Sequence, residues 1–264
     1  VRVSGALQTL NICSMHIGDA GAKSLAEVLR VNAVVTELYL QDNFIGSVGA
    51  DALAQALRVN AVLTTLLLGS NDIGEIGASA LAESLKVNAV LTRLDLEHNA
   101  IRDKGAEALA RALCVNAVLK VLHLQDNKIA DAGASAMADA LSVNPVLTKL
   151  SLGAGDIGPS GAEALAGALR GNAVLTRLDL FHNAIGDKGA EALASALHVN
   201  TALATLYLHR NAIGDQGAKA LASALRARAV HTYLDLACND INKACKEHLR
   251  KAVSGRCLLY TSDA

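Results

Sequence analysis

Hydrophobic residues recur along this chain with a fixed period of 28 residues. The pattern LxxLxLxxNxI, followed by GAxALAxAL and VNAV, starts without an insertion at Leu7, Val35, Leu63, Leu91, Leu119, Leu147, Leu175, Leu203 and His231. The LxL alternation predicts a short strand with one buried face, and the apolar spacing after the glycine predicts a helix of about eleven residues. Because one such unit cannot bury its own apolar face, the period predicts a solenoid in which stacked units share one core.

The predicted fold is an α/β, right-handed αβ solenoid of nine 28-residue units, with a parallel sheet inside and helices outside. Helices are wider than the ~4.8 Å spacing of strands, so stacking them outside the sheet should bend the array into a horseshoe with a concave sheet. We expect strands at residues 37–40, 65–68, 93–96, 121–124, 149–152, 177–180, 205–208 and 233–236.

Three polar positions recur in most units and predict how the units are held together. Asn99 and its equivalents end the strand, and their amides should form a ladder that satisfies buried loop backbone. Asp103 and its equivalents stand where the N-cap of the same unit's helix belongs. Asn116 suits a left-handed residue after the helix.

The unbroken period leaves no linker, so we expect one repeat domain over residues 1–258. Residues 1–6 match the end of a repeat, which suggests that the chain is a piece of a longer protein. Residues 231–258 are expected to form a C-terminal capping repeat and residues 259–264 a non-repeat tail. At the other end, the first unit should present a partly covered apolar edge formed by Leu10, Ile12, Ile17, Leu25 and Leu29.

Composition narrows the class of partner. The net charge of -1, from 24 basic and 25 acidic residues, gives no basic field for nucleic acid. The mean hydropathy of +0.32 comes from alanine and leucine within the units, and charges interrupt every apolar run, so membrane insertion is not expected. Five cysteines without a CxxC pair predict reduced thiols and a cytoplasmic location.

The fourth unit has the sequence LTRLDLEHNAIRDKGAEALARALCVNAV. This unit and its neighbours resemble leucine-rich repeats of the ribonuclease-inhibitor subfamily. Their low variation is similar to the repeat arrays of NOD-like receptors. This resemblance implies a noncatalytic protein-interaction module, such as the sensing or regulatory region of a NOD-like receptor-type protein. The chain lacks the tryptophan and abundant cysteine of ribonuclease inhibitor, and the acidic tail of Ran GTPase-activating proteins.

The exposed strand positions of the seventh to ninth units carry three of the chain's six Tyr and Phe residues. Rings on an exposed sheet usually contact something, and rings and arginine dominate protein interfaces. The seventh unit is also nearly a copy of the fourth, but the concave Glu97 becomes Phe181. We therefore predict a protein partner on the concave face, bound by Phe181, Tyr207, His209, Arg210, Tyr233, Asp179 and His182.

A second polar group lies in the fourth and fifth units, where Asp95 should neighbour His123 and His98 should neighbour Asp126. Glu97 completes this group. A metal site is conceivable here, but an open strand seldom preorganises four ligands, so charge pairs or a secondary partner patch are favoured. We predict no metal and no cofactor. In the sixth unit, the small residues Ser151, Gly153 and Ala154 suggest either a notch for a partner residue or neutral drift.

We do not expect an enzyme, because no Ser or Cys nucleophile is adjacent to a His and a carboxylate in a cleft. The recurring glycines belong to the repeat pattern and do not form a phosphate-binding loop. Two alternatives to concave recognition remain. One is a structural scaffold or adaptor that uses its helices in a larger assembly. The other is a GTPase-activating or enzyme-inhibitor leucine-rich repeat protein.

Overall fold

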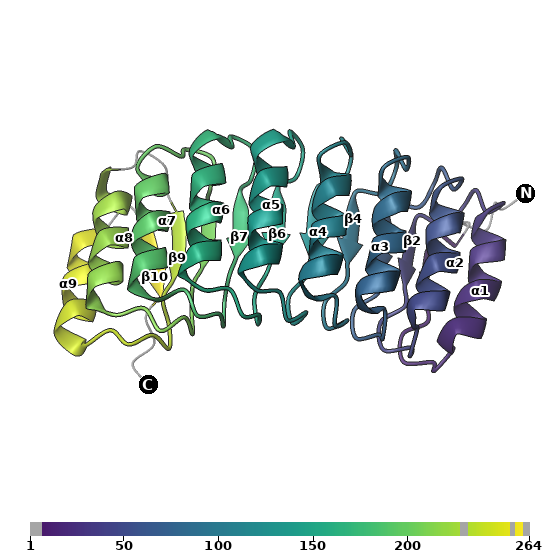
Figure 1. Ribbon diagram of the computed structural model, residues 1–264, viewed down its shortest axis with the longest axis horizontal. Coiled ribbons are helices and arrows are strands. Elements are labelled where there is room, and N and C mark those ends of the chain that lie inside the picture. The colour runs from purple at the N-terminus through teal and green to yellow at the C-terminus, as the bar shows by residue number, and fades with distance from the viewer. Residues whose placement is uncertain (1–6, 228–231, 254–256, 261–264) are drawn as a thin grey trace, which may run out of the picture.

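The computed structural model describes residues 7–227, 232–253 and 257–260, which form one array of strand and helix turns (Figure 1). The strands are β1 (Thr9–Asn11), β2 (Glu37–Tyr39), β3 (Thr65–Leu67), β4 (Arg93–Asp95), β5 (Val121–His123), β6 (Lys149–Ser151), β7 (Arg177–Asp179), β8 (Thr205–Tyr207), β9 (Thr232–Asp235) and β10 (Cys257–Tyr260). The helices are α1 (Gly18–Leu29), α2 (Ser47–Leu57), α3 (Gly74–Leu85), α4 (Arg102–Leu113), α5 (Asp131–Val143), α6 (Pro159–Gly171), α7 (Gly186–Leu197), α8 (Asp215–Ala227) and α9 (Lys243–Val253).

All the strands belong to one parallel sheet whose order follows the chain, from β1 to β10. The central leucines pair in register, as Leu38 with Leu66 and Leu66 with Leu94. In Figure 1 the helices stand side by side in one layer in front of the strands. The predicted αβ solenoid is confirmed, and each predicted strand lies within one residue of the observed one.

The core lies between these two layers. Leu38 and Leu66 of the strands and Ala50 and Leu53 of α2 are all buried, so strand leucines pack against the small and large apolar residues of the helices. The helices approach closely: a Cβ placed on Gly77 would lie 2.9 Å from the Ala50 Cβ of the preceding helix. Glycine at this position is therefore required by helix packing.

The predicted asparagine ladder is present. Asn127 is buried, and its Nδ2 donates to the carbonyls of Leu96 (2.8 Å), Leu124 (3.0 Å) and Gln125 (3.2 Å). Its Oδ1 accepts the N–H groups of Asn99 (2.9 Å) and Ile101 (3.1 Å) in the preceding unit. One side chain thus satisfies backbone groups of two adjacent turns.

A second ladder follows the helices, and here the prediction for Asn116 is wrong. Its equivalent Asn144 has φ -77 and ψ 121, which is extended rather than left-handed backbone. Asn116 Nδ2 donates to the carbonyl of Leu85 (2.7 Å) in the preceding unit, and its Oδ1 accepts from Leu119 N–H (2.8 Å). The same amide contacts recur at Asn60, Asn88, Asn144, Asn172 and Asn200.

The prediction that Asp103 caps its own helix is also wrong. Asp103 is the second residue of α4, and its Oδ1 accepts the N–H groups of Ala130 (2.8 Å) and Gly133 (3.0 Å) at the start of α5. The carboxylate therefore caps the helix of the following unit, because that helix presents unpaired N–H groups within its reach. Equivalent bonds to the following unit are made by Asp19, Asp131, Asp187 and Asp215.

The presence or absence of this aspartate decides the backbone conformation of one residue in the following unit, which lies just before the helix or at its first position. After an aspartate the residue is extended, as at Ala130 (φ -109, ψ -162). Where Ser47, Glu75 or Pro159 replaces the aspartate, the corresponding residue of the next unit is left-handed, with φ values of 63 at Gly74, 55 at Arg102 and 60 at Gly186. Glycine tolerates this conformation, but Arg102 does so at a cost of about 1 kcal/mol.

The two ends of the array differ from its middle. At the first unit, Leu10, Ile12, Ile17 and Leu25 are only partly buried, as expected, whereas Leu29 is buried. At the other end, the first two residues of the expected tail pair with the sheet. Leu259 and Tyr260 belong to β10, which pairs with Leu234 and Asp235 of β9, because the free edge of β9 offers N–H and C=O groups to a further strand. Residues 1–6 and 261–264 lie outside the described residues.

Replacing Glu75 by aspartate should stabilise the protein. The shorter carboxylate would stand where Asp19 and Asp103 stand, accept the N–H groups of Arg102 and Gly105, and allow Arg102 to leave the left-handed region. We expect a gain of about 1 kcal/mol in the free energy of unfolding, measured by urea denaturation. Glu107→Asp, the same change at a half-buried position inside α4, is the control. Equal stabilities of the two variants would contradict the capping argument.

Replacing Asn127 by alanine should destabilise the protein by about 1–3 kcal/mol, because it leaves buried N–H and C=O groups of two turns without partners. Lys104→Ala, at an exposed helix position, should change stability by less than about 0.5 kcal/mol. Thermal unfolding followed by circular dichroism measures both. If both variants melt at the same temperature, the ladder does not stabilise the array.

Candidate functional site

The predicted aromatic residues meet on the sheet face, by which we mean the face of the sheet turned away from the helices. The rings of Phe181 and His209 stack with centroids 5.0 Å apart and planes 13° apart. Tyr207 meets His209 edge-on at 6.4 Å and Tyr233 at 5.4 Å. The Arg177 guanidinium lies 4.6 Å from the centre of the Tyr207 ring. We call these five residues the ring cluster.

Adjacent strands position the ring cluster. Arg177 belongs to β7, Tyr207 to β8 and Tyr233 to β9, and the parallel register places Arg177 beside Thr205 and Thr205 beside Tyr233. Side chains at matching places on neighbouring strands face the same side of a sheet. The 28-residue repeat therefore brings together rings that are distant in sequence.

The small residues of the sixth unit do not leave a notch open. A Cβ added to Gly153 would lie 2.1 Å from Cδ1 of Phe181, so the ring of Phe181 occupies the space above this glycine. Phe181 is half-buried between Gly153 and His209. The interpretation of Gly153 as a notch for a partner residue is wrong, because the chain's own next unit fills it.

Two carboxylates lie beneath the ring cluster. Asp179 is only 9% exposed, accepts the N–H of Phe181 (3.2 Å) and lies 3.8 Å from the Arg177 guanidinium. Burial raises the pKa of Asp179, and the Phe181 N–H and the Arg177 charge oppose this effect. Asp235 is also buried and approaches His209 Nδ1 at 3.2 Å. Nε of Arg177 is buried and donates no hydrogen bond within the described residues.

The other two predicted residues, His182 and Arg210, lie apart from the ring cluster. Both are exposed and left-handed, with φ of 50 and 56, and both directly precede an asparagine of the first ladder. They therefore lie on the rim where strands turn toward helices. The structure brings together Phe181, Tyr207, His209, Tyr233 and Asp179 and places His182 and Arg210 at the border of this group.

The second predicted patch divides into two parts. On the sheet face, Asp95 and His123 are neighbours in register, and Gln125 donates to Glu97. Burial raises the pKa of Asp95; burial, followed by the positive charge of Arg93, lowers the pKa of His123.

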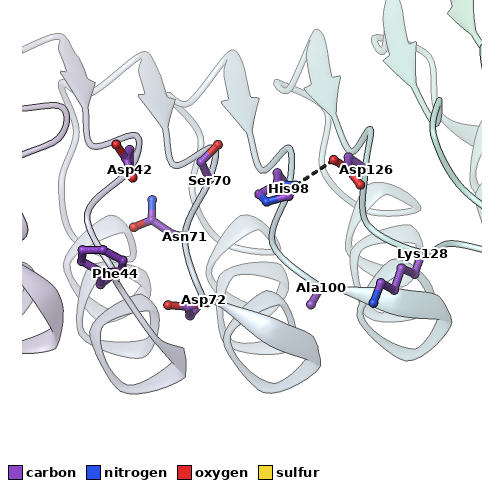
Figure 2. Close-up of a pocket in the computed structure, with 9 residues that line it drawn as sticks. All are labelled: Asp42, Phe44, Ser70, Asn71, Asp72, His98, Ala100, Asp126 and Lys128. Carbon is purple, nitrogen blue, oxygen red and sulfur yellow. Dashed lines mark hydrogen bonds and ion pairs between the residues drawn. The ribbon is translucent and has the colours of Figure 1, made fainter.

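On the rim, His98 Nδ1 lies 2.7 Å from Asp126 Oδ2, and both side chains are exposed (Figure 2). Sheet-face and rim residues of this patch therefore form separate pairs. Within the described residues, no group of three or more His, Cys, Asp or Glu side chains could hold a metal ion.

The sequence interpretation missed a hollow on the same rim, between the second and fifth units. Phe44 stands there beside Asp42 and Asp72 (Figure 2). A signal was available, since Phe44 is one of two phenylalanines and stands where other units have alanine, aspartate, lysine or histidine. None of the described helices is both long and apolar enough to cross a membrane.

Among known proteins, similarity is found to solved structures. A search of curated proteins finds no match. Among solved structures, the chain is similar to the yeast complex of Rad7 and Elc1, with 16% identity over 92% of this chain and 66% of the other, and a TM-score of 0.52. It is also similar to actin-binding site 2 of leiomodin-1, with 24% identity over 53% of this chain and 82% of the other, and a TM-score of 0.47. At 16% identity, the likeness to the Rad7 and Elc1 structure shows the fold alone. With a TM-score of 0.47, the likeness to leiomodin-1 supports no conclusion about this chain.

The sequence pattern described as "Leucine Rich repeat" matches residues 31–54, 59–82, 87–110, 115–138, 143–166, 171–194 and 199–222. These segments fall in seven consecutive turns of the observed solenoid and together make up more than half of the chain. The chain therefore belongs to the leucine-rich repeat family.

Proposed function

We propose that this chain is a noncatalytic protein-recognition module whose partner binds the concave sheet face of the seventh to ninth units. The observation that supports this proposal is the ring cluster, in which Phe181, Tyr207, His209 and Tyr233 contact one another on an open sheet. Aromatic residues and arginine supply most of the binding energy of protein interfaces. Their gathering at one place on a largely non-aromatic surface marks this place as the centre of an interface.

The chemistry of the cluster suits a protein surface better than a small substrate. Arg177 is already oriented over Tyr207, so its guanidinium needs little further ordering when a partner's acceptor arrives. The His209–Asp235 pair lies on the open sheet rather than in a cleft that excludes water. This supports recognition rather than catalysis.

The finer assignment follows from the resemblance of the repeats. We propose that they are of the ribonuclease-inhibitor type, act in the cytoplasm and serve as the sensing or regulatory region of a NOD-like receptor-type protein. Their regular 28-residue units, each with a full helix, support this subfamily. An inhibitor or GTPase-activating protein of the same fold would also bind its partner through exposed strands and rim loops.

A scaffold function is the second candidate, and one observation favours it. A valine at the end of each of several helices, or two residues beyond it, is exposed, and these valines form a row along the return loops. This row comprises Val31, Val59, Val87, Val115, Val143 and Val199. Exposed apolar rows mark contact surfaces, and this one lies away from the sheet face, at the ends of the helices.

Replacing Phe181 by glutamate tests the main proposal while keeping the fold. The fourth unit already has this arrangement, since Glu97 lies over Gly69 as Phe181 lies over Gly153. The test uses a protein partner that is first isolated through its binding to the wild-type chain. For this partner, Phe181→Glu together with Tyr207→Ala should weaken binding by at least ~2 kcal/mol. Isothermal titration calorimetry measures the affinity, and circular dichroism checks that the array remains folded.

The matched control is Lys188→Ala with Glu191→Ala on helix α7 of the same unit, which should leave the affinity unchanged. Unchanged binding by the ring variant, with loss in the helix variant or on replacing Val115 and Val143 by serine, would favour the scaffold.

A further inference from the structure

The rim of the second to fifth units contains a hollow of about 540 Å³ that no part of the ring cluster touches. In Figure 2 Phe44 stands at one end and Lys128 at the other, with Asp72 between Phe44 and Ala100. Asp42 and Ser70 lie along the upper side, nearer the strands. Each wall residue comes from the loop between a strand and the following helix.

Differences between neighbouring loops account for the hollow. Phe44, Ala100 and Lys128 are left-handed, with φ of 56, 52 and 55, whereas the equivalent Asp72 is not. Instead, the Asp72 N–H bonds back to the Ile45 carbonyl of the preceding unit at 2.9 Å. The third loop is thus drawn toward the second, and space remains between it and the fourth, where Ala100 has only a methyl group.

Phe44 gives this hollow an apolar end. Its side chain is 58% exposed, and one face of the ring stacks on His16 at 5.0 Å with planes 14° apart. A large exposed ring beside a hollow is a surface that a ligand group can cover with a gain in buried apolar area.

The polar groups near Phe44 include carboxylates that differ in whether they already have a hydrogen-bond or ion-pair partner. Asp42 accepts a hydrogen bond from the Ser14 hydroxyl at 3.0 Å, and Asp126 is paired with His98 at 2.7 Å. The Asp72 side chain has neither a hydrogen bond nor an ion pair within the described part of the chain. The cation of the hollow, Lys128, lies at the far end, so the end that holds Phe44 and Asp72 is acidic.

We propose that this hollow binds an arginine side chain of a protein partner, with the guanidinium between Asp42 and Asp72 and against the Phe44 ring. A guanidinium donates to carboxylates from a flat group that also stacks on aromatic faces, and it therefore matches both walls. The protein contains the same contact internally, since the Arg177 guanidinium lies 4.6 Å from the Tyr207 ring centre. This site goes beyond the concave recognition proposed above and is independent of it.

The experiment is an NMR titration of the whole ¹⁵N-labelled chain with two blocked dipeptides, acetyl-Arg-Leu-amide and acetyl-Gln-Leu-amide. The arginine peptide should cause saturable shifts of the Phe44, Ser70 and Asp72 amide signals and bind at least ~5-fold more tightly than the glutamine peptide. Asp72→Asn should weaken binding of the arginine peptide by a similar factor. Asp156→Asn, at the equivalent position of the sixth unit, should not.

Phe44→Ala provides a second variant, compared with Ile76→Ala at another exposed apolar position, and only the former should weaken binding. The proposal is overturned if the arginine peptide gives no saturable shifts, if both peptides bind alike, or if Asp72→Asn and Asp156→Asn have equal effects. Shifts confined to the ring cluster or to the return-loop valines would overturn it as well. Phe181→Glu should leave this titration unchanged, so the two proposals succeed or fail separately.

Discussion

Each turn of this solenoid depends on asparagine side chains that bond to the backbone of the turn before it. Asn127 reaches carbonyls and N–H groups of two units at the strand end, and Asn116 does the same at the helix end. These amides are buried, so a displaced turn would lose several bonds that water cannot replace. An insertion within a unit would move the amide away from its partners, which explains why 28 residues separate every pair of equivalent positions.

The aspartate caps bond along the array in the opposite direction to the asparagine amides. Asp103 bonds to the start of α5, so a helix that follows an aspartate unit is capped by the unit before it, whereas the Asn127 amide acts on the unit before its own. Adjacent turns are therefore tied by polar bonds in both directions along the array. At the sixth unit Gly155 has no side chain to act in the ladder, and a Cβ there would lie only 2.6 Å from the Ile129 carbonyl. Backbone contact closes this gap, together with the Asp156 N–H bond to that carbonyl at 2.8 Å.

The sequence predicted the elements well because burial alone sets their period. Strands at residues 93–96 and 121–124 required only that Leu94 and Leu122 face a core. The sequence did not predict the partners of Asp103 and Asn116, because a repeat pattern shows that a polar side chain recurs without showing whether it bonds within its own turn or to the next. For the site, neighbours on adjacent strands were predicted correctly, as with Asp95 and His123. The packing of Phe181 on Gly153 and the hollow beside Phe44 depend on side-chain volumes and loop conformations in adjacent units, which periodicity does not contain.

The packing of Phe181 has a consequence for how such an array changes what it recognises. Phe181 and Glu97 occupy the same position in their units, and each lies over a glycine of the unit before. The same column contains other contacts between successive units, including Cys13 with Gln41 and Phe181 with His209. A side chain in this column contacts its equivalents in the neighbouring units, so its effect on binding is coupled to both neighbours. Recognition is then a property of pairs of adjacent turns, while the two asparagine ladders below remain unchanged.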